Sequence, residues 1–147
     1  MLDYCMIEIP LIIIELEKDN FHILIEGNFA DQIPHYWIVD TGASKTVLDI
    51  NQVAAYEIIE SDNSEDYQSA GINQGMMETM VGKMAQINFN ELCIKGLKVA
   101  LIDLSHVNDI YRKFTSVRVA GLLGGDILMH YKCMIDYERK IIQFQNI

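Results

Sequence analysis

Short segments rich in β-branched and aromatic residues recur at close intervals along the whole chain. They cover residues 7–17, 21–26, 36–39, 46–48, 76–89, 97–102, 117–122, 133–136 and 141–144. Turn-forming residues separate several of them, at residues 18–20, 27–28, 95–96 and 137–140. Such runs between turns are typical of strands joined by hairpins, so the sequence predicts a mostly β fold, either a barrel or a sandwich.

Three short helices are expected among the strands. The first follows Asp49 as its N-cap and extends through Tyr56, and the second follows Ser105 and extends to about Phe114. The third begins at residues 125–126 and ends near residue 131. The longest polar stretch, residues 60–75, is expected to be a mobile surface loop.

The length and composition suit one domain over residues 1–147. Half of the 147 residues are apolar, which is enough for a hydrophobic core of its own. The formal charge of −10 would repel phosphate backbones and anionic lipid surfaces, so neither nucleic acid nor a membrane is an expected partner. The longest apolar run, residues 9–14, is too short to span a bilayer, and no basic leader precedes it. A cytoplasmic location is therefore expected.

Neither a metal site nor an organic cofactor is indicated. Cys5, Cys93 and Cys133 are odd in number and far apart, without the spacing of a zinc site or a disulfide framework. They are expected to be free, buried thiols in a reducing compartment. The histidines, at positions 22, 35, 106 and 130, show no metal-ligand spacing either.

One carboxylate lies directly after an apolar strand and directly before a tight turn. Residues 37–44 read Trp-Ile-Val-Asp-Thr-Gly-Ala-Ser, which puts Asp40 at the end of a buried strand. Desolvation there disfavours the charged form, so the carboxylate needs donors, and the Thr41 hydroxyl and the N–H groups of Gly42 and Ala43 are suitable. The plainer interpretation is a turn aspartate that caps its own backbone.

A second segment late in the chain decides between these interpretations. Residues 120–128 read Ala-Gly-Leu-Leu-Gly-Gly-Asp-Ile-Leu. With the turn at 40–44, this segment resembles the retropepsin-like aspartic peptidases, the group of single-domain bacterial enzymes related to retroviral proteases. The resemblance covers nearly the whole chain, and residues 134–140 are similar to the last hairpin of bacterial members. It implies a closed β-barrel of the acid-protease type with two or three short helices.

The resemblance also implies roles for individual residues. The catalytic turn would be Asp40, Thr41 and Gly42, and the late segment would cross beneath it and brace it through Leu122, Leu123 and Gly124. Residues 69–82 would form the flap that folds over bound peptide. The expected substrate-binding residues are Ala43, Ser44, Gly71, Ile72 and Gly75.

The family uses two aspartates that share one proton and activate a water molecule. The chain contains no second Asp-Thr-Gly or Asp-Ser-Gly, and Asp126 is better explained by the start of a helix. The resemblance therefore implies a homodimer with one Asp40 from each copy, in which Thr41 reaches across to the partner. The expected activity is hydrolysis of peptide or protein substrates by an aspartic endopeptidase. Retroviral members pair Asp with Arg where this chain has Ser44 and Gly125, so their subsite contacts do not transfer.

Two other functions remain open from the sequence. One is a non-catalytic dimeric β-barrel that binds peptides or supports assembly, and the other is a monomer with an isolated Asp40. Cleavage that disappears in Asp40→Asn while the fold persists would separate the enzyme from both. The chain ends, residues 1–6 and 141–147, could interleave between subunits as edge strands.

Overall fold

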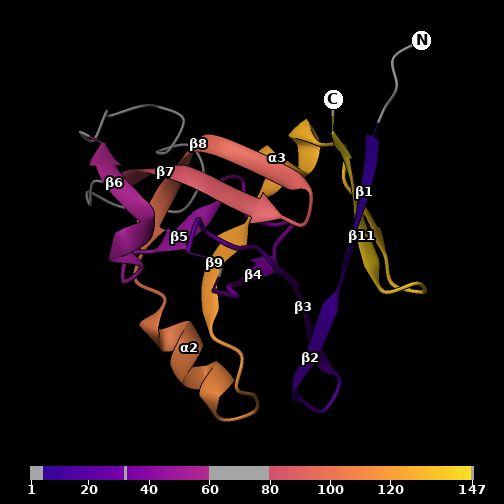
Figure 1. The fold of residues 1–147 in the computed structure, drawn as a ribbon. Helices are drawn as coiled ribbons and strands as arrows, with labels where there is room; N and C mark the ends of the chain where they lie inside the picture. Colours follow the sequence, from indigo (N-terminus) through magenta and orange to yellow (C-terminus); the bar gives the residue numbers. More distant parts are fainter. Residues whose placement is uncertain (1–4, 32, 60–79, 147) are drawn as a thin grey trace.

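A computed structural model describes residues 5–31, 33–59 and 80–146 (Figure 1). These residues are mostly in strands: β1 (Cys5–Pro10), β2 (Ile12–Glu17), β3 (Asn20–Glu26), β4 (Tyr36–Val39), β5 (Val47–Asp49), β6 (Tyr56–Ile59), β7 (Met80–Phe89), β8 (Leu92–Ile102), β9 (Val119–Leu123), β10 (Met134–Asp136) and β11 (Ile141–Asn146). The helices are a 3₁₀ turn (Val53–Ala55), α2 (Ser105–Arg112) and α3 (Gly125–His130). The prediction of a mostly β fold is confirmed.

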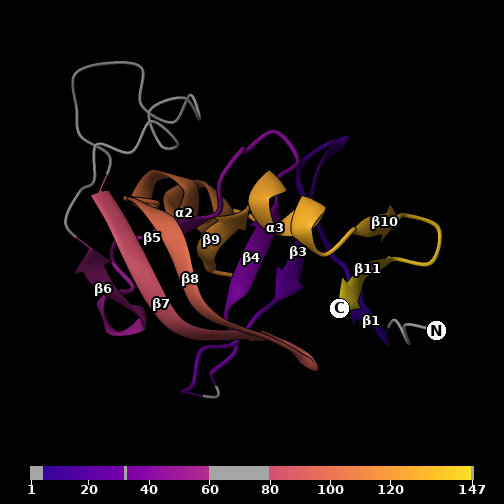
Figure 2. The same cartoon turned by 90° about the horizontal axis from the view of Figure 1, so that it is seen from above.

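The strands form two sheets. The larger has the order β2-β3-β4-β9-β5-β8-β7-β6, and the smaller has the order β1-β11-β10. Figures 1 and 2 both show the smaller sheet at one side of the molecule. Among the described residues β2 and β6 end the larger sheet without pairing to each other, so the closure of the barrel stays a prediction.

The central strands of the larger sheet lie between two hydrophobic cores. Alternate side chains point to opposite faces of a strand, so Leu24 of β3 enters one core and Ile25 enters the other. The same alternation divides Val47 from Leu48 on β5. Helix α2 contributes Tyr111 to the second core. The strands nearest Asp40 are therefore held from both faces.

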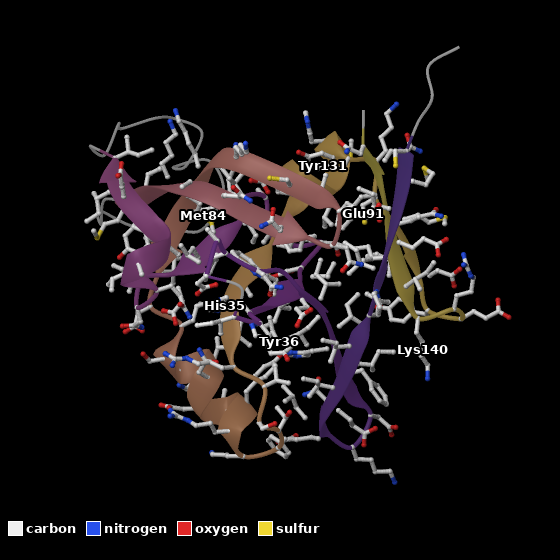
Figure 3. All side chains as sticks on the ribbon, in the orientation of Figure 1. His35, Tyr36, Met84, Glu91, Tyr131 and Lys140 are labelled. Atoms are coloured by element: carbon white, nitrogen blue, oxygen red, sulfur yellow. The ribbon has the colours of Figure 1, made fainter. Side chains whose placement is uncertain are left out.

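A row of aromatic rings joins the two sheets through the first core. The ring centroids of Trp37 and Phe89 lie 6.1 Å apart, and those of Phe89 and Phe144 lie 6.3 Å apart. Tyr131, labelled in Figure 3, meets Phe144 edge-on at 6.3 Å. Offset and edge-to-face pairs of this kind stabilise a core beyond the area that they bury.

The expected helix after Asp49 is wrong in type and extent. Only Val53–Ala55 forms a single 3₁₀ turn, and Tyr56 begins β6, opposite Met84 of β7. Asp49 is not the N-cap of this turn, because that position is occupied by Gln52. The Asp49 carboxylate instead accepts from the backbone N–H groups of Leu104 and Asn51. The second and third helices are confirmed as α2 and α3, within two residues of the expected ends.

The turns at 18–20 and 137–140 are confirmed, and the other two are wrong. Residues 95–96 lie inside β8, and the hairpin turns instead at Asn90, which has a φ of 52°. Residues 27–28 do lie between the antiparallel strands β3 and β4, but Asn28 forms a bridge with Asn88 and the connection continues to residue 35, so they are not a tight turn. The expected strand at 7–17 is interrupted at Leu11, whose N–H donates to Lys140, and its halves enter different sheets.

The loop expected at 60–75 lies outside the described residues. No helix in the described ranges 5–31, 33–59 and 80–146 is long and apolar enough to cross a bilayer.

Candidate active site

Asp40 lies at the end of β4, on a backbone that the neighbouring strand fixes. β9 runs parallel to β4, with Leu122 opposite Ile38 and Leu123 opposite Val39. The Asp40 N–H then donates to the Leu123 carbonyl at 3.0 Å. Because β4 ends there, the next residues can turn while the position of Asp40 stays fixed.

The turn itself is closed by the atoms of Asp40. Its Oδ1 accepts from the Gly42 N–H at 3.0 Å, and its carbonyl accepts from the Ala43 N–H at 3.2 Å. The Asp40 side chain is half-buried, whereas Thr41 and Gly42 are exposed. The carboxylate is therefore oriented by its own turn and still accessible from one side.

β9 lies between β4 and β5, so the two strands that flank the turn are not paired with each other. It is parallel to β4 and antiparallel to β5, with Gly121 opposite Leu48. A Cβ at Gly121 would lie 2.3 Å from the Val47 carbonyl oxygen and 2.4 Å from the Trp37 ring. Only glycine fits this approach, and the sequence reasoning did not single out Gly121.

A buried hydroxyl joins β5 to the start of α3. Thr46 is completely buried, and its Oγ1 donates to Oδ1 of Asp126 at 2.7 Å and accepts from the Gly124 N–H at 3.1 Å. The same carboxylate oxygen accepts from the Thr46 N–H at 3.0 Å. Asp126 is in the first turn of α3, as expected, with Gly124 as the N-cap.

The first residues of α3 also bind the turn at residues 40–44 through the backbone. Gly125 donates to the Ala43 carbonyl at 2.7 Å, and Asp126 donates to the Ser44 carbonyl at 3.2 Å. A Cβ at Gly124 would lie 2.6 Å from the backbone carbon of Lys45, whereas one at Gly125 would have no described atom closer than 3.5 Å. The close approach therefore requires glycine at 124 and permits a side chain at 125.

The Asp-Thr-Gly turn, the strand behind it and the first residues of α3 all lie within the match to a known family. The model of the aspartyl protease family matches residues 25–127. The chain belongs to the aspartyl protease family.

Solved structures show which branch of the aspartyl proteases the fold resembles. A retropepsin-like aspartic protease from Rickettsia conorii is 17% identical with a TM-score of 0.51, and the match covers 99% of this chain and 95% of that one. The retroviral protease-like domain of Ddi1 from Leishmania major is 14% identical with a TM-score of 0.53, covering 86% and 90%. The fold is thus retropepsin-like. No curated protein matches the sequence significantly.

A larger protein contains a similar fold as one part of its length. The structure of edgp is 10% identical with a TM-score of 0.58, and the match covers 97% of this chain but 46% of that one. This chain therefore spans just under half of the length of edgp.

The residues predicted for the site fall into two groups. Those of the turn and of its support lie together: Asp40, Thr41, Gly42, Ala43, Ser44, Leu122, Leu123 and Gly124. Leu123 is fully buried in the first core, and Leu122 packs against the second. The remaining predicted residues, Gly71, Ile72 and Gly75, lie outside the described residues.

Sequence reasoning missed Thr46 as a supporting residue and gave Asp126 only a helix role. The available signal for Thr46 was a hydroxyl next to Val47 and Leu48 in an otherwise apolar strand. A buried hydroxyl needs partners, and the carboxylate at the start of the next glycine-led helix was a candidate.

The described cysteines are free, and no group of three or more His, Cys, Asp or Glu residues within 5–31, 33–59 and 80–146 could hold a metal ion. Cys5 and Cys93 are exposed, so the expectation of buried thiols is wrong for these two residues. Burial raises the pKa of the Cys133 thiol to about 11, which favours the neutral, unreactive form.

Proposed function

We propose that this aspartyl protease is an endopeptidase in which the Asp40 carboxylates of two copies activate one water molecule. The observation that carries the proposal is the position of Asp40: a half-buried, accessible carboxylate whose backbone is bonded to β9 and whose Oδ1 is bonded to Gly42. A catalytic group needs this combination of fixed geometry and access to substrate.

The proposed reaction needs two carboxylates that share a proton. The ionised one takes a proton from water, whose oxygen attacks the peptide carbonyl carbon, while the protonated one donates to the carbonyl oxygen. The C–N bond then breaks as the leaving nitrogen receives a proton. Because the chain has only one Asp-Thr-Gly, the second carboxylate comes from a second copy across a twofold axis. The Thr41 hydroxyl, on the exposed turn, is assigned to the contact with that copy.

The smaller sheet supports a homodimer, with one change to the expected arrangement. β1 and β11 pair with each other within one chain, rather than being left as two free ends. Their register runs from Cys5 opposite Asn146 to Pro10 opposite Ile141. β11 is the central strand, so among the described residues the open edges belong to β1 and β10. Open edges pair readily with other strands, and a second copy could extend the sheet there.

The decisive experiment compares peptide cleavage by the wild type, Asp40→Asn and Asp19→Asn. Asp19→Asn is the matched control because it removes the same charge from an exposed hairpin turn with a φ of 64°, which asparagine tolerates. We expect Asp40→Asn to lose cleavage of a denatured protein substrate and Asp19→Asn to keep it. Sedimentation velocity should show dimers for all three proteins.

Two results would contradict the proposal. Cleavage that survives in Asp40→Asn would exclude this carboxylate as the catalyst. A folded wild-type dimer that cleaves no substrate at any pH between the acidic and neutral ranges would favour the non-catalytic peptide-binding or assembly module.

A further inference from the structure

A cavity at the far end of β9 from Asp40 is lined by charged groups of both signs. Asp40 lies beside Leu123, the last residue of β9, whereas Arg118 precedes its first residue. The cavity has a volume of about 490 Å³, within the usual range for small-molecule sites. It is lined by residues of β5, α2 and the segments around them, among them Asp49, Asn51, Ser105, Asn108, Arg112 and Arg118. It is therefore separate from the candidate active site.

One oxygen of the Asp49 carboxylate lacks a donor. The residue is 1% exposed, and its Oδ1 accepts from the backbone N–H of Asn51 at 3.2 Å, the Asn51 amide at 2.8 Å and the Leu104 N–H at 3.2 Å. Its Oδ2 is buried and has no hydrogen-bond partner among the described residues. A buried carboxylate oxygen without a donor is unfavourable, so a ligand that donates there would be stabilised.

The other polar groups at this end of the cavity are already used. Asn51 also donates to Asp103, and the Ser105 hydroxyl donates to the same carboxylate at 2.6 Å. Asn108 donates to and accepts from the backbone of Val119. Oδ2 of Asp49 is thus the acceptor that these side chains leave for a ligand.

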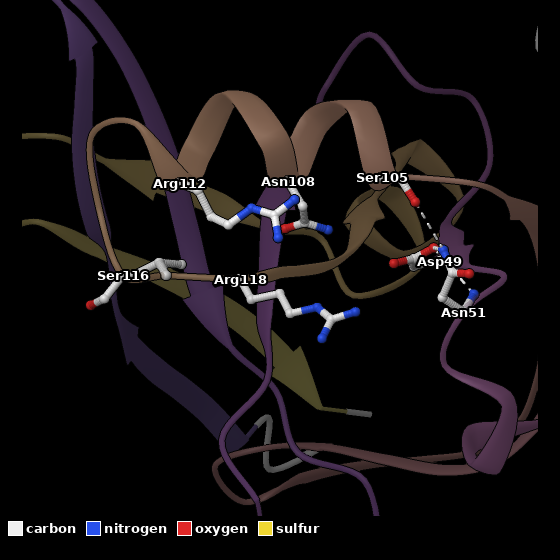
Figure 4. Close-up of a pocket in the computed structure, with 8 residues that line it drawn as sticks. Asp49, Asn51, Ser105, Asn108, Arg112, Ser116 and Arg118 are labelled. Atoms are coloured by element: carbon white, nitrogen blue, oxygen red, sulfur yellow. Dashed lines mark hydrogen bonds between the residues drawn. The ribbon is translucent and has the colours of Figure 1, made fainter.

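Two guanidinium groups line the same cavity. Figure 4 shows the side chains of Arg112 and Arg118 extending from one end of it toward Asp49 and Asn51. Arg112 pairs with Asp109 on its own helix, whereas Arg118 makes no hydrogen bond or ion pair with the described residues. Arg118 is therefore the main group that could receive an anion, with Arg112 second.

We propose that this cavity binds a small α-amino-acid zwitterion, with its ammonium on Oδ2 of Asp49 and its carboxylate on Arg118. A simple anion would meet the Asp49 carboxylate, and a simple cation would meet the two guanidinium groups. A molecule that carries both charges satisfies both ends of the cavity. A free amino acid and a dipeptide share this chemistry. The site is independent of the proposed peptide hydrolysis.

The test titrates the full chain with L-alanine and with L-alanyl-L-alanine, followed by calorimetry and by amide chemical shifts. The N-acetylated dipeptide and the dipeptide amide each lack one of the two charges. Concentrations up to about 10 mM would saturate a site with a millimolar Kd. We expect binding of at least one zwitterion, with shifts at Asn51 and Ser105, and no saturable binding of either capped form. Which of the two zwitterions binds more tightly identifies the source.

Variants tie the binding to the cavity. Arg118→Ala changes an exposed side chain and should weaken zwitterion binding at least about tenfold, because it removes a charge-assisted contact. Lys113→Ala removes an equal charge beside Arg112 but outside the cavity lining, and should bind as the wild type does. Asp49→Asn keeps one oxygen for its donors and should abolish binding of the ammonium.

Three outcomes would overturn the proposal. One is the absence of saturable binding of both zwitterions, and another is equal binding of a capped dipeptide. The third is unchanged affinity in Arg118→Ala. Arg118→Ala and Lys113→Ala decide the matter even if Asp49→Asn fails to fold, which circular dichroism would reveal.

Discussion

Thr46 is expected to contribute more to stability through its hydroxyl than through its methyl group. Thr46→Val keeps the shape of the side chain but removes the donor to Asp126 and the acceptor of the Gly124 N–H, in a position with no exposed surface. Thr46→Ser keeps both hydrogen bonds and removes one methyl group. The pair therefore separates hydrogen bonding from packing.

The expected magnitudes follow from what each variant leaves unpaired. In Thr46→Val, the buried Gly124 N–H loses its partner, which costs about 1–3 kcal/mol, and Asp126 loses one of its donors. The carboxylate keeps two N–H donors, from Thr46 and Ile127, so its loss is about 1 kcal/mol. The total is about 2–4 kcal/mol. Thr46→Ser should lose about 1 kcal/mol, for one buried methyl group.

Urea unfolding monitored by the fluorescence of Trp37 measures both variants. Trp37 is the single tryptophan and is completely buried, so its emission reports on the core beside the turn. Protein concentration is held constant because dimer formation would add to the apparent stability. An unchanged m value would show that the variants unfold from the same compact state. If Thr46→Val were as stable as Thr46→Ser, the hydroxyl would not be the link between β5 and α3.

Two further predictions concern the glycine pair and the buried thiol. Gly124→Ala should destabilise the fold by about 1–3 kcal/mol, because its Cβ would lie 2.6 Å from the Lys45 backbone. Gly125→Ala should change stability by less than about 0.5 kcal/mol. Similar losses for the two variants in thermal unfolding would contradict the close approach at Gly124. With a pKa of about 11, the Cys133 thiol is about 0.1% thiolate at pH 8. Iodoacetamide should therefore modify Cys133 more slowly than the exposed Cys93 in the folded protein, and at a similar rate after unfolding. Mass spectrometry follows both modifications. Equal rates in the folded protein would show that Cys133 is not protected.

The strands around the candidate site could be predicted because their signals are local. β4 has the expected bounds, 36–39, since an apolar run ends abruptly at a polar turn. The start of α3 follows from the glycine pair and Asp126. The position of residues 122–124 behind the turn was not a local inference, since it was implied by the resemblance to retropepsin-like peptidases.

The errors arise where distant partners override local preference. Asp49 has the sequence context of an N-cap, but its carboxylate accepts from Leu104, 55 residues away, and β7 draws Tyr56 into a strand. Lys95 and Gly96 have the composition of a turn, yet pairing with β7 continues through them. The hydroxyl of Thr46 meets Asp126 across 80 residues, a separation that no short window of sequence reveals.

The insertion of β9 between β4 and β5 has a consequence for the order of events during synthesis. The Asp40 backbone is tied to Leu123, and Thr46 is tied to Gly124, 78 residues later. A nascent chain that has not yet produced residues 119–126 lacks the element that separates the two flanking strands and fixes the aspartate between them. Closing so long a loop is an entropically late step. The turn that holds Asp40 therefore cannot be completed before most of the chain has left the ribosome.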